Sequence, residues 1–248
     1  MTTPPNPGGN SGWIWVNGRA VAPGIRGGFA LADLLVVLAV VALLAAIIVP
    51  MISHARSKSR LAQCVANLQQ VSRACLLYAE DHKGTLPALD SSPAPGPWWY
   101  YKEQVKGYIG LTGPSSANDK VFACPADRGY DEGLGKVTPF WQSRKHDFTS
   151  YNFNSINLPG VTNIAGRTIS SIREPARTLL VMEWTAHAPL SWHQSRTGRE
   201  NHPFYDNARS VVGFVDGHVD FIPIYYDGMN AAYTRDPIPG YGYKYSGD

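Results

Sequence analysis

Charged side chains are scarce in this sequence. Its 248 residues include 22 Lys and Arg and 19 Asp and Glu, which leaves a formal net charge of only +3. No basic run with interleaved aromatic residues is present, and Arg19 and Arg26 near the start account for most of the positive balance. Because a nucleic-acid site needs a concentrated basic surface, we expect no nucleic-acid partner.

Cysteine is also rare, with three residues at Cys64, Cys75 and Cys124. They form no C-x-x-C pair, which excludes a zinc ribbon and a thioredoxin-type motif. An oxidising compartment would allow one disulfide and leave one thiol over. Cys64 and Cys75 would lie about 16 Å apart along a helix and cannot bond to each other, whereas Cys124 could reach either.

The common catalytic motifs are missing as well. The sequence contains no H-E-x-x-H, no G-x-S-x-G and no Gly-rich phosphate loop. Four of the seven histidines fall within 32 residues, namely His187, His193, His202 and His218. Their spacings place no two of them on one helix turn or one strand face, so they do not favour catalytic zinc. We therefore predict a protein that is not an enzyme and that needs no cofactor.

One long apolar run stands out against this background. The 21 residues from Phe29 to Val49 contain a single charge, Asp33, and as a helix they would span about 30 Å, the thickness of a bilayer core. Arg26 just before the run favours a cytoplasmic N-terminus. A buried core helix and an ordinary signal peptide are the alternatives, but the run is apolar all round and longer than a signal-peptide core. The polar, Gly- and Pro-rich residues 1–28 are expected to lack regular structure.

The helical pattern continues beyond Pro50, which is expected to kink or loosen it. An apolar face recurs at spacings of three and four residues: Leu61, Cys64, Val65, Leu68, Ser72, Cys75, Leu76 and Ala79. Polar residues, Asn67 among them, take much of the other side. The helix is expected to end between Asp81 and Gly84, where His, Lys and Gly follow one another.

Strand signals are weak between 85 and 177 and return in residues 178–184 and 210–222. The second stretch predicts a two-residue hairpin with Asp216-Gly217 at the turn. In that register Val212, Phe214, Val219 and Phe221 share one face, which should pack on the amphipathic helix. The last residues, 240–248, are expected to be mobile. The fold class is α+β: a long N-terminal helix on a small antiparallel sheet in a loop-rich head.

The start of the apolar run resembles the type IV prepilin N-terminus, which type IV pilins and type II secretion pseudopilins share. The matching residues are Gly28, Phe29, Asp33 and Pro50. The resemblance implies cleavage between Gly28 and Phe29 by a prepilin peptidase, methylation of Phe29, and assembly with other pilin-like subunits. The family usually has Glu where this chain has Asp33. An acid within the bilayer needs a partner, which in these filaments is the amino terminus of a neighbouring subunit, and the shorter Asp side chain would lengthen that contact.

The rest of the chain resembles prepilin-like proteins with a C-terminal His-x9-Asp-Gly signature. The matching fragments surround Cys64, Cys124-Pro125, Ser150-Tyr151-Asn152, Glu183 and the turn Asp216-Gly217-His218. Because Cys64 and Cys124 both lie in such fragments, the resemblance favours a disulfide between them. His202 departs from the signature, since 13 residues rather than nine separate it from Asp216.

The signature turn also allows a second interpretation. Asp216 and Gly217 tolerate positive φ, so a turn explains them without chemistry. A hard-cation site for Ca²⁺ would instead use oxygens of Glu183, Asp216 and Asp220. The turn is the simpler interpretation, and calcium remains a weak candidate.

Together these patterns divide the chain into a prepilin leader (1–28), a transmembrane and filament-core helix (29–50), its amphipathic extension (51–84) and a periplasmic head (85–248). We expect a pilin-like subunit of a secretion or pilus machine, held in inner-membrane lipid. The sequence leaves pilus and secretion pseudopilus equally open. Two alternatives remain: a membrane-tethered module that binds carbohydrate, for which the aromatic run 98–101 could stack on sugars, and a metalloenzyme on a membrane stalk.

Overall fold

The computed structural model describes nine stretches of the chain: 14–16, 19–21, 31–88, 99–129, 137–156, 160–187, 190–193, 208–225 and 238–248. The chain divides into two compact units, Met1–Ser53 and His54–Asp248. In the first unit, β1 (Ile14–Val16) pairs with β2 (Arg19–Val21) in an antiparallel ladder. The expectation that all of the first 28 residues lack regular structure is therefore wrong for these two strands.

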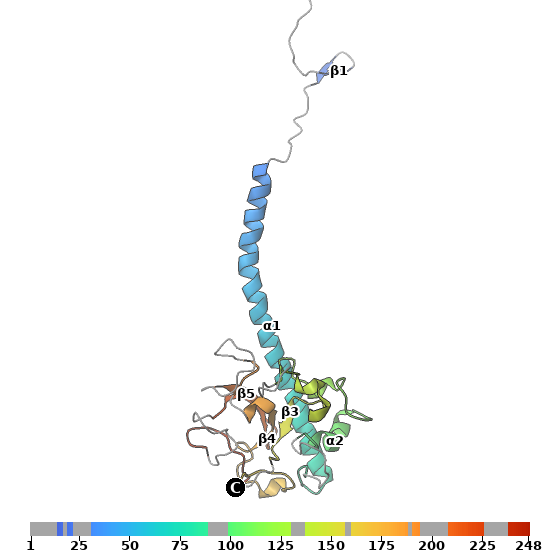
Figure 1. Cartoon of the computed structure of the whole chain (residues 1–248), viewed down its shortest axis with the longest axis vertical. Coiled ribbons are helices and arrows are strands. Elements are labelled where there is room, and N and C mark those ends of the chain that lie inside the picture. Colours follow the sequence, from blue (N-terminus) through green and yellow to red (C-terminus); the bar gives the residue numbers. More distant parts are fainter. Residues whose placement is uncertain are drawn as a thin grey trace, which may run out of the picture. The chain divides into compact units, whose positions relative to one another are not determined.

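A single helix, α1 (Leu31–Asp81), contributes to both units and continues without interruption through Pro50 (Figure 1). It ends where the sequence predicts. The Gly84 N–H donates to the Ala79 carbonyl oxygen at 2.7 Å, and Lys83 and Gly84 both have positive φ. This left-handed ending suits Gly, because Gly has no Cβ to oppose it.

The buried face of α1 is shifted from the predicted one, because Leu61, Val65 and Leu76 are only partly buried. It consists of Cys64, Asn67, Leu68, Val71, Ser72, Ala74, Cys75 and Ala79. The assignment of Asn67 to the polar side is wrong. Its Nδ2 donates to the Ala123 carbonyl oxygen at 2.8 Å and to that of Lys120 at 3.2 Å. These bonds satisfy a buried amide that would otherwise be costly, which explains why a polar residue can occupy this face.

A four-stranded antiparallel sheet packs against the C-terminal half of α1 (Figure 1). Its order is β3-β4-β5-β6, with β3 at Tyr151–Phe153, β4 at Leu179–Glu183, β5 at Arg209–Phe214 and β6 at Val219–Pro223. This arrangement confirms the predicted α+β class and the β4 strand. The short strand β3 had no clear sequence signal.

Short helices fill the connections. They are α2 (Tyr101–Val105), η1 (Lys106–Ile109), η2 (Lys120–Phe122), η3 (Phe140–Gln142), η4 (Arg144–His146), η5 (Ile169–Ser171) and η6 (Trp184–Ala186). Lys102 of α2 ties several of these connections together. Its buried ammonium group lies 2.9 Å from the Asp119 carboxylate and donates to the carbonyl oxygens of Asp147 and Phe148 at 2.8 and 3.2 Å.

The hairpin between β5 and β6 has a different register from the predicted one. Val211 lies opposite Phe221 and Gly213 opposite Val219, one residue away from the expected pairing. The Gly217 N–H donates to the Phe214 carbonyl oxygen, and Gly217 has a φ of 94°. The loop is therefore a turn centred on residues 215 and 216, followed by a bulge at Gly217, a connection that places one more residue in the loop.

This register divides the predicted apolar face between two cores. Val211, Val219 and Phe221 pack in the core that includes α1. The core on the other side of the sheet contains Leu179, Met182, Ala186, Val212, Phe214, Ile224, Ile238, Tyr243 and Tyr245. The prediction that Val212 and Phe214 face the helix is wrong, because a shift of one residue moves a side chain to the opposite face.

Strand β5 lies close to α1 at Gly213. A Cβ added to this residue would lie 2.3 Å from the Ser72 Oγ. The absence of a side chain at Gly213 therefore lets the strand lie directly against the helix.

The C-terminal residues are part of the fold rather than mobile. Tyr243 and Tyr245 are almost fully buried in the second core, and Lys244 forms a parallel bridge with Thr178. The Asn154 Nδ2 donates to the Tyr245 carbonyl oxygen at 2.8 Å. The expectation of a mobile end is wrong because its alternate aromatic residues supply apolar surface to the sheet.

Candidate functional site

The N-terminal part of α1 presents a continuous apolar surface. Fifteen large apolar side chains between Leu31 and Ile52 are each at least 45% exposed. By length and composition this segment is able to cross a membrane. A membrane anchor and a signal sequence both have these properties.

The structure describes only two of the four residues that carry the prepilin resemblance. Asp33 and Pro50 are exposed on α1, with Asp33 in the first turn. An acid in this position interacts favourably with the positive end of the helix dipole. Gly28 and Phe29, the predicted cleavage and methylation site, lie outside the described residues.

The signature turn forms its own hydrogen bonds. The Asp216 Oδ1 accepts from the His218 backbone N–H at 3.1 Å and lies 2.6 Å from His218 Nδ1. The His218 ring stacks on Phe214, with their centroids 4.1 Å apart. These contacts are those of a structural turn.

The three carboxylates proposed for calcium do not form a cluster. Asp216 bonds to His218 at the turn, and Asp220 is exposed on β6. Glu183 is fully buried and contacts His193. Within the described residues, these three carboxylates therefore do not come together as ligands of one ion.

The histidines are separated as well. His187 is buried, its Nδ1 lies 3.3 Å from the Asn152 Nδ2, and burial lowers the pKa of its imidazole to about 3. His193 and His218 each contact a different carboxylate, and His202 lies outside the described residues.

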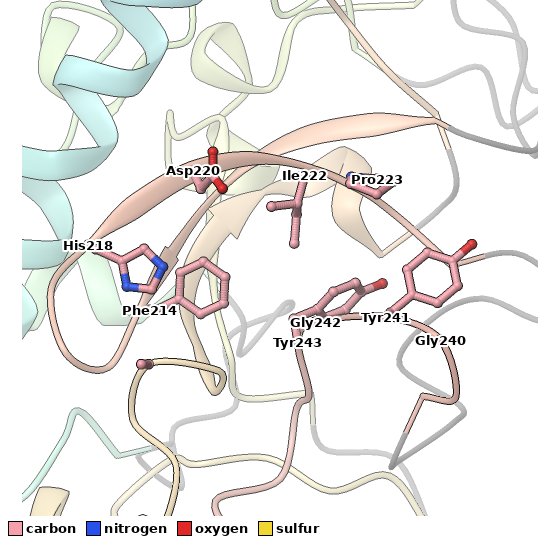
Figure 2. A pocket seen from close by; sticks show the side chains of 10 residues that line it. Phe214, His218, Asp220, Ile222, Pro223, Gly240, Tyr241, Gly242 and Tyr243 are labelled. Carbon is pink, nitrogen blue, oxygen red and sulfur yellow. The ribbon is translucent and has the colours of Figure 1, made fainter.

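A pocket of about 500 Å³ lies on the sheet face that is away from α1. Figure 2 shows Phe214 and His218 of the hairpin on one side, Tyr241 and Tyr243 of the C-terminal segment on the other, and Ile222 pointing into the space between them. The lining also includes Asp220. Aromatic rings with a few polar groups are typical of pockets for small molecules.

A second group of functional side chains lies between α1 and the sheet, around a disulfide. Cys64 of α1 is bonded to Cys124, with the two Cα atoms 4.9 Å apart. This is the pair that the family resemblance favoured. Cys75, the third cysteine, is buried and free, and burial raises the pKa of its thiol.

An imidazole and a carboxylate face this disulfide. The His193 Nε2 lies 3.7 Å from the Cys124 Sγ and 2.8 Å from the Glu183 Oε1. The other oxygen of Glu183 accepts from the Val211 backbone N–H at 2.9 Å. Both side chains are almost completely buried.

Further hydrogen bonds hold the loop that carries Cys124. The Cys124 backbone N–H donates to the Ser150 Oγ at 3.0 Å, and this hydroxyl donates to the Asp127 carboxylate at 2.7 Å. Burial raises the pKa of Asp127 to about 7, although the Gly129 N–H and three other donors partly oppose the rise. This network holds the Cys124 backbone against Ser150, the residue that precedes β3.

A smaller pocket, of about 230 Å³, reaches His193. Its lining consists of Ser57, Arg60, Ala126, Arg128, Trp192 and His193. The two guanidinium groups make its surroundings positive, which favours anionic groups near His193.

From the sequence, Cys64 was paired with Cys124 through the family resemblance and Glu183 and His193 were named separately, but the four residues were not placed in one cluster. They come from α1, the loop after η2, the end of β4 and the segment 190–193. No local spacing connects segments so far apart. The family resemblance marked Cys64, Cys124 and Glu183, and His193 carried no signal that distinguished it from the other histidines.

The chain matches no family model, no curated protein and no solved structure in the comparisons with known proteins. The observed class is an α+β protein in which a long N-terminal helix packs on a small antiparallel sheet. This architecture is compatible with a pilin-like fold.

Proposed function

We propose that this protein is a pilin-like subunit that is processed by a prepilin peptidase, anchored in a membrane by α1 and assembled through α1 into a filament. Its partners would be the peptidase, lipid and other subunits with the same kind of helix. The head would supply the surface of the filament, and the protein itself would catalyse no reaction.

The observation that carries this proposal is the apolar surface of α1 between Leu31 and Ile52. Contiguous exposed apolar patches on soluble monomers rarely exceed a few hundred Å², and a helix that is apolar all round belongs in lipid or in a bundle of helices. The same helix continues into an amphipathic half that packs on the sheet. One helix can therefore serve both as a membrane anchor and as the helix on which the sheet of the head packs.

Asp33 provides the test of assembly. The full chain would be expressed together with a prepilin peptidase and its assembly partners, and filaments would be recovered by shearing. We expect Asp33→Asn to remain in the membrane but to form no filaments, because an amide cannot form an ion pair with a neighbouring amino terminus. Asp33→Glu should assemble at least as well as the parent.

The matched control is Glu80→Gln, which removes an exposed acid from the other end of the same helix and should leave assembly unchanged. Normal filaments from Asp33→Asn would contradict the proposed role of the acid. A chain that is fully soluble without detergent would contradict the anchor itself.

A second candidate function is binding of carbohydrate, and the pocket in Figure 2 favours it. Sugars stack their apolar faces on aromatic rings and their hydroxyl groups donate hydrogen bonds to carboxylates, and the pocket offers Tyr241 and Asp220. A glycan array probed with the full chain in detergent would test this function. Binding that Tyr241→Ala abolishes and that Tyr108→Ala, outside the pocket, preserves would support it, and an array without binding would remove it.

A further inference from the structure

The disulfide cluster contains more chemistry than a structural crosslink needs. We propose that, once the disulfide is reduced, the chain binds one zinc-class divalent ion in a buried site made of four side chains: Cys64, Cys124, His193 and Glu183. The site would then exist in two exclusive forms, a disulfide and a metal complex. This inference does not depend on filament assembly.

Geometry is the first argument. One donor atom from each of the four side chains lies within 4.8 Å of all the others. In a tetrahedral zinc site, with ligands at about 2.0–2.3 Å from the ion, neighbouring donor atoms lie about 3–4 Å apart. The four donor atoms are therefore already close to the corners of a coordination tetrahedron. Small side-chain movements would complete this geometry.

The types of donor select the metal. Two thiolates, one imidazole and one carboxylate are ligands that zinc accepts, whereas calcium and magnesium prefer oxygen alone. Two thiolates and a carboxylate would leave one net negative charge after the ion is bound. Arg60 and Arg128, which line the pocket that reaches His193, would offset this charge.

The surroundings orient the ligands. The Glu183 Oε2 accepts from the Val211 N–H, which leaves Oε1 directed at His193. The His193 Nε2 faces both this oxygen and the Cys124 sulfur, so one nitrogen is directed at the centre of the cluster. In metal sites, the ligand atoms that do not bind the metal regularly form hydrogen bonds that orient the side chain.

A purely structural disulfide leaves the histidine and the glutamate unexplained. Burying an ionisable carboxylate is costly unless it is paired, and the partners of Glu183 are His193 and the Val211 N–H rather than the disulfide. Glu183 is fully buried and the His193 side chain is 3% exposed, and a donor atom of each lies within 4.8 Å of both sulfur atoms. A site that holds a cation in one of its states accounts for their placement.

The conversion balances with a dithiol as the reductant. The dithiol gives two electrons and two protons to the S–S bond of Cys64 and Cys124 and is itself oxidised to a disulfide. Binding of Zn²⁺ then displaces the two thiol protons to solvent, while His193 binds through Nε2 and keeps its proton on Nδ1. Metal affinity should therefore fall at low pH, where thiols stay protonated.

The test uses the full chain in detergent with Cys75→Ala, so that the only thiols are those of the pair. Co²⁺ replaces Zn²⁺ as a spectroscopic probe, before and after treatment with a phosphine reductant. We expect one equivalent of Co²⁺ to bind to the reduced chain, with thiolate-to-cobalt charge transfer and the visible bands of tetrahedral coordination, and none to bind to the oxidised chain. Zn²⁺ should displace the Co²⁺ and raise the melting temperature of the reduced chain.

The ligand variants refine the test. Each variant is first checked for native circular dichroism in its oxidised form, in which the disulfide supports the fold. His193→Ala and Glu183→Gln should each weaken Co²⁺ binding by at least about tenfold, whereas His218→Ala, which removes an exposed imidazole, should not change it.

Three results would overturn the proposal. The first is a reduced, folded chain that shows no charge-transfer band. The second is full Co²⁺ affinity in His193→Ala. The third is a disulfide that cannot be reduced unless the chain unfolds, with no refolding when metal is added, because the metal form would then be inaccessible to the native protein.

Discussion

The contact between β5 and α1 at Gly213 supports a quantitative prediction. Gly213→Ala adds a Cβ that would lie 2.3 Å from the Ser72 Oγ and 3.3 Å from the Val181 carbonyl oxygen. Gly213 does not have positive φ, so Ala introduces no backbone strain and the effect reports on packing alone. Overpacking of this kind costs about 1–3 kcal/mol, and we expect the free energy of unfolding to fall by that amount.

The closest clash involves one atom, which makes a double-mutant cycle informative. The Ser72 Oγ is buried and has no hydrogen-bond partner among the described residues, so Ser72→Ala should be neutral or stabilising. In the double variant the nearest atoms to the new Cβ would be the Val181 oxygen at 3.3 Å and the residue 72 Cβ at 3.4 Å. We expect the double variant to recover at least about 1 kcal/mol relative to the sum of the single variants.

Urea unfolding of the full chain at a fixed detergent concentration, followed by tryptophan fluorescence, would measure these values. Gly107→Ala is the matched control, because an added Cβ there meets nothing within 4 Å, and it should change stability by less than about 0.5 kcal/mol. A cycle that is additive within about 0.3–0.5 kcal/mol would refute the packing of β5 on Ser72.

Two further predictions concern buried ionisable side chains. Burial lowers the pKa of His187 to about 3, against about 6.5 in an unfolded chain, so the unfolded state binds more protons between pH 6.5 and 3 and stability should fall as the pH falls through this window. His187→Gln should flatten the fall, as measured by urea midpoints at several pH values, and an unchanged slope would contradict the assignment. Lys102→Met should lower stability by about 3–5 kcal/mol, because it leaves the Asp119 carboxylate and two carbonyl groups without their ammonium partner. Exposed Lys58→Met should change thermal unfolding very little, and equal effects of the two substitutions would exclude the buried ion pair.

The helix was the most predictable part of the fold. Its apolar half has no competing pattern, and the Gly at position 84 marks its end through a backbone conformation that other residues resist. The error at Asn67 has a clear cause. A polar side chain on a buried face is favourable only when distant carbonyl groups accept its hydrogen bonds, and the sequence does not say where the residues around Ala123 will lie.

The hairpin register could not be derived because both faces of β5 are buried. Val211 and Val212 are adjacent and both apolar, so the alternation that normally identifies the inner face is absent. The burial of the tail was hidden for a similar reason. Its tyrosines stand among Gly residues, a composition typical of mobile ends, and only the second core explains their order.

The two candidate sites also differ in how far the sequence alone could predict them. The resemblance to a prepilin N-terminus is local, because it depends only on residues between Gly28 and Pro50. The cluster of Cys64, Cys124, Glu183 and His193 depends on four segments that only the folded chain brings together. The partners of such a cluster follow from tertiary structure and not from spacing along the chain.

The most direct test of the proposed function is the mass of the mature N-terminus. The full chain would be expressed with a prepilin peptidase, recovered from the membrane fraction and analysed by mass spectrometry of its N-terminal peptide. The account predicts a chain that begins at Phe29 and carries one methyl group on its amino terminus. A membrane-bound chain that keeps residues 1–28, or a soluble chain cut after the apolar segment, would contradict it.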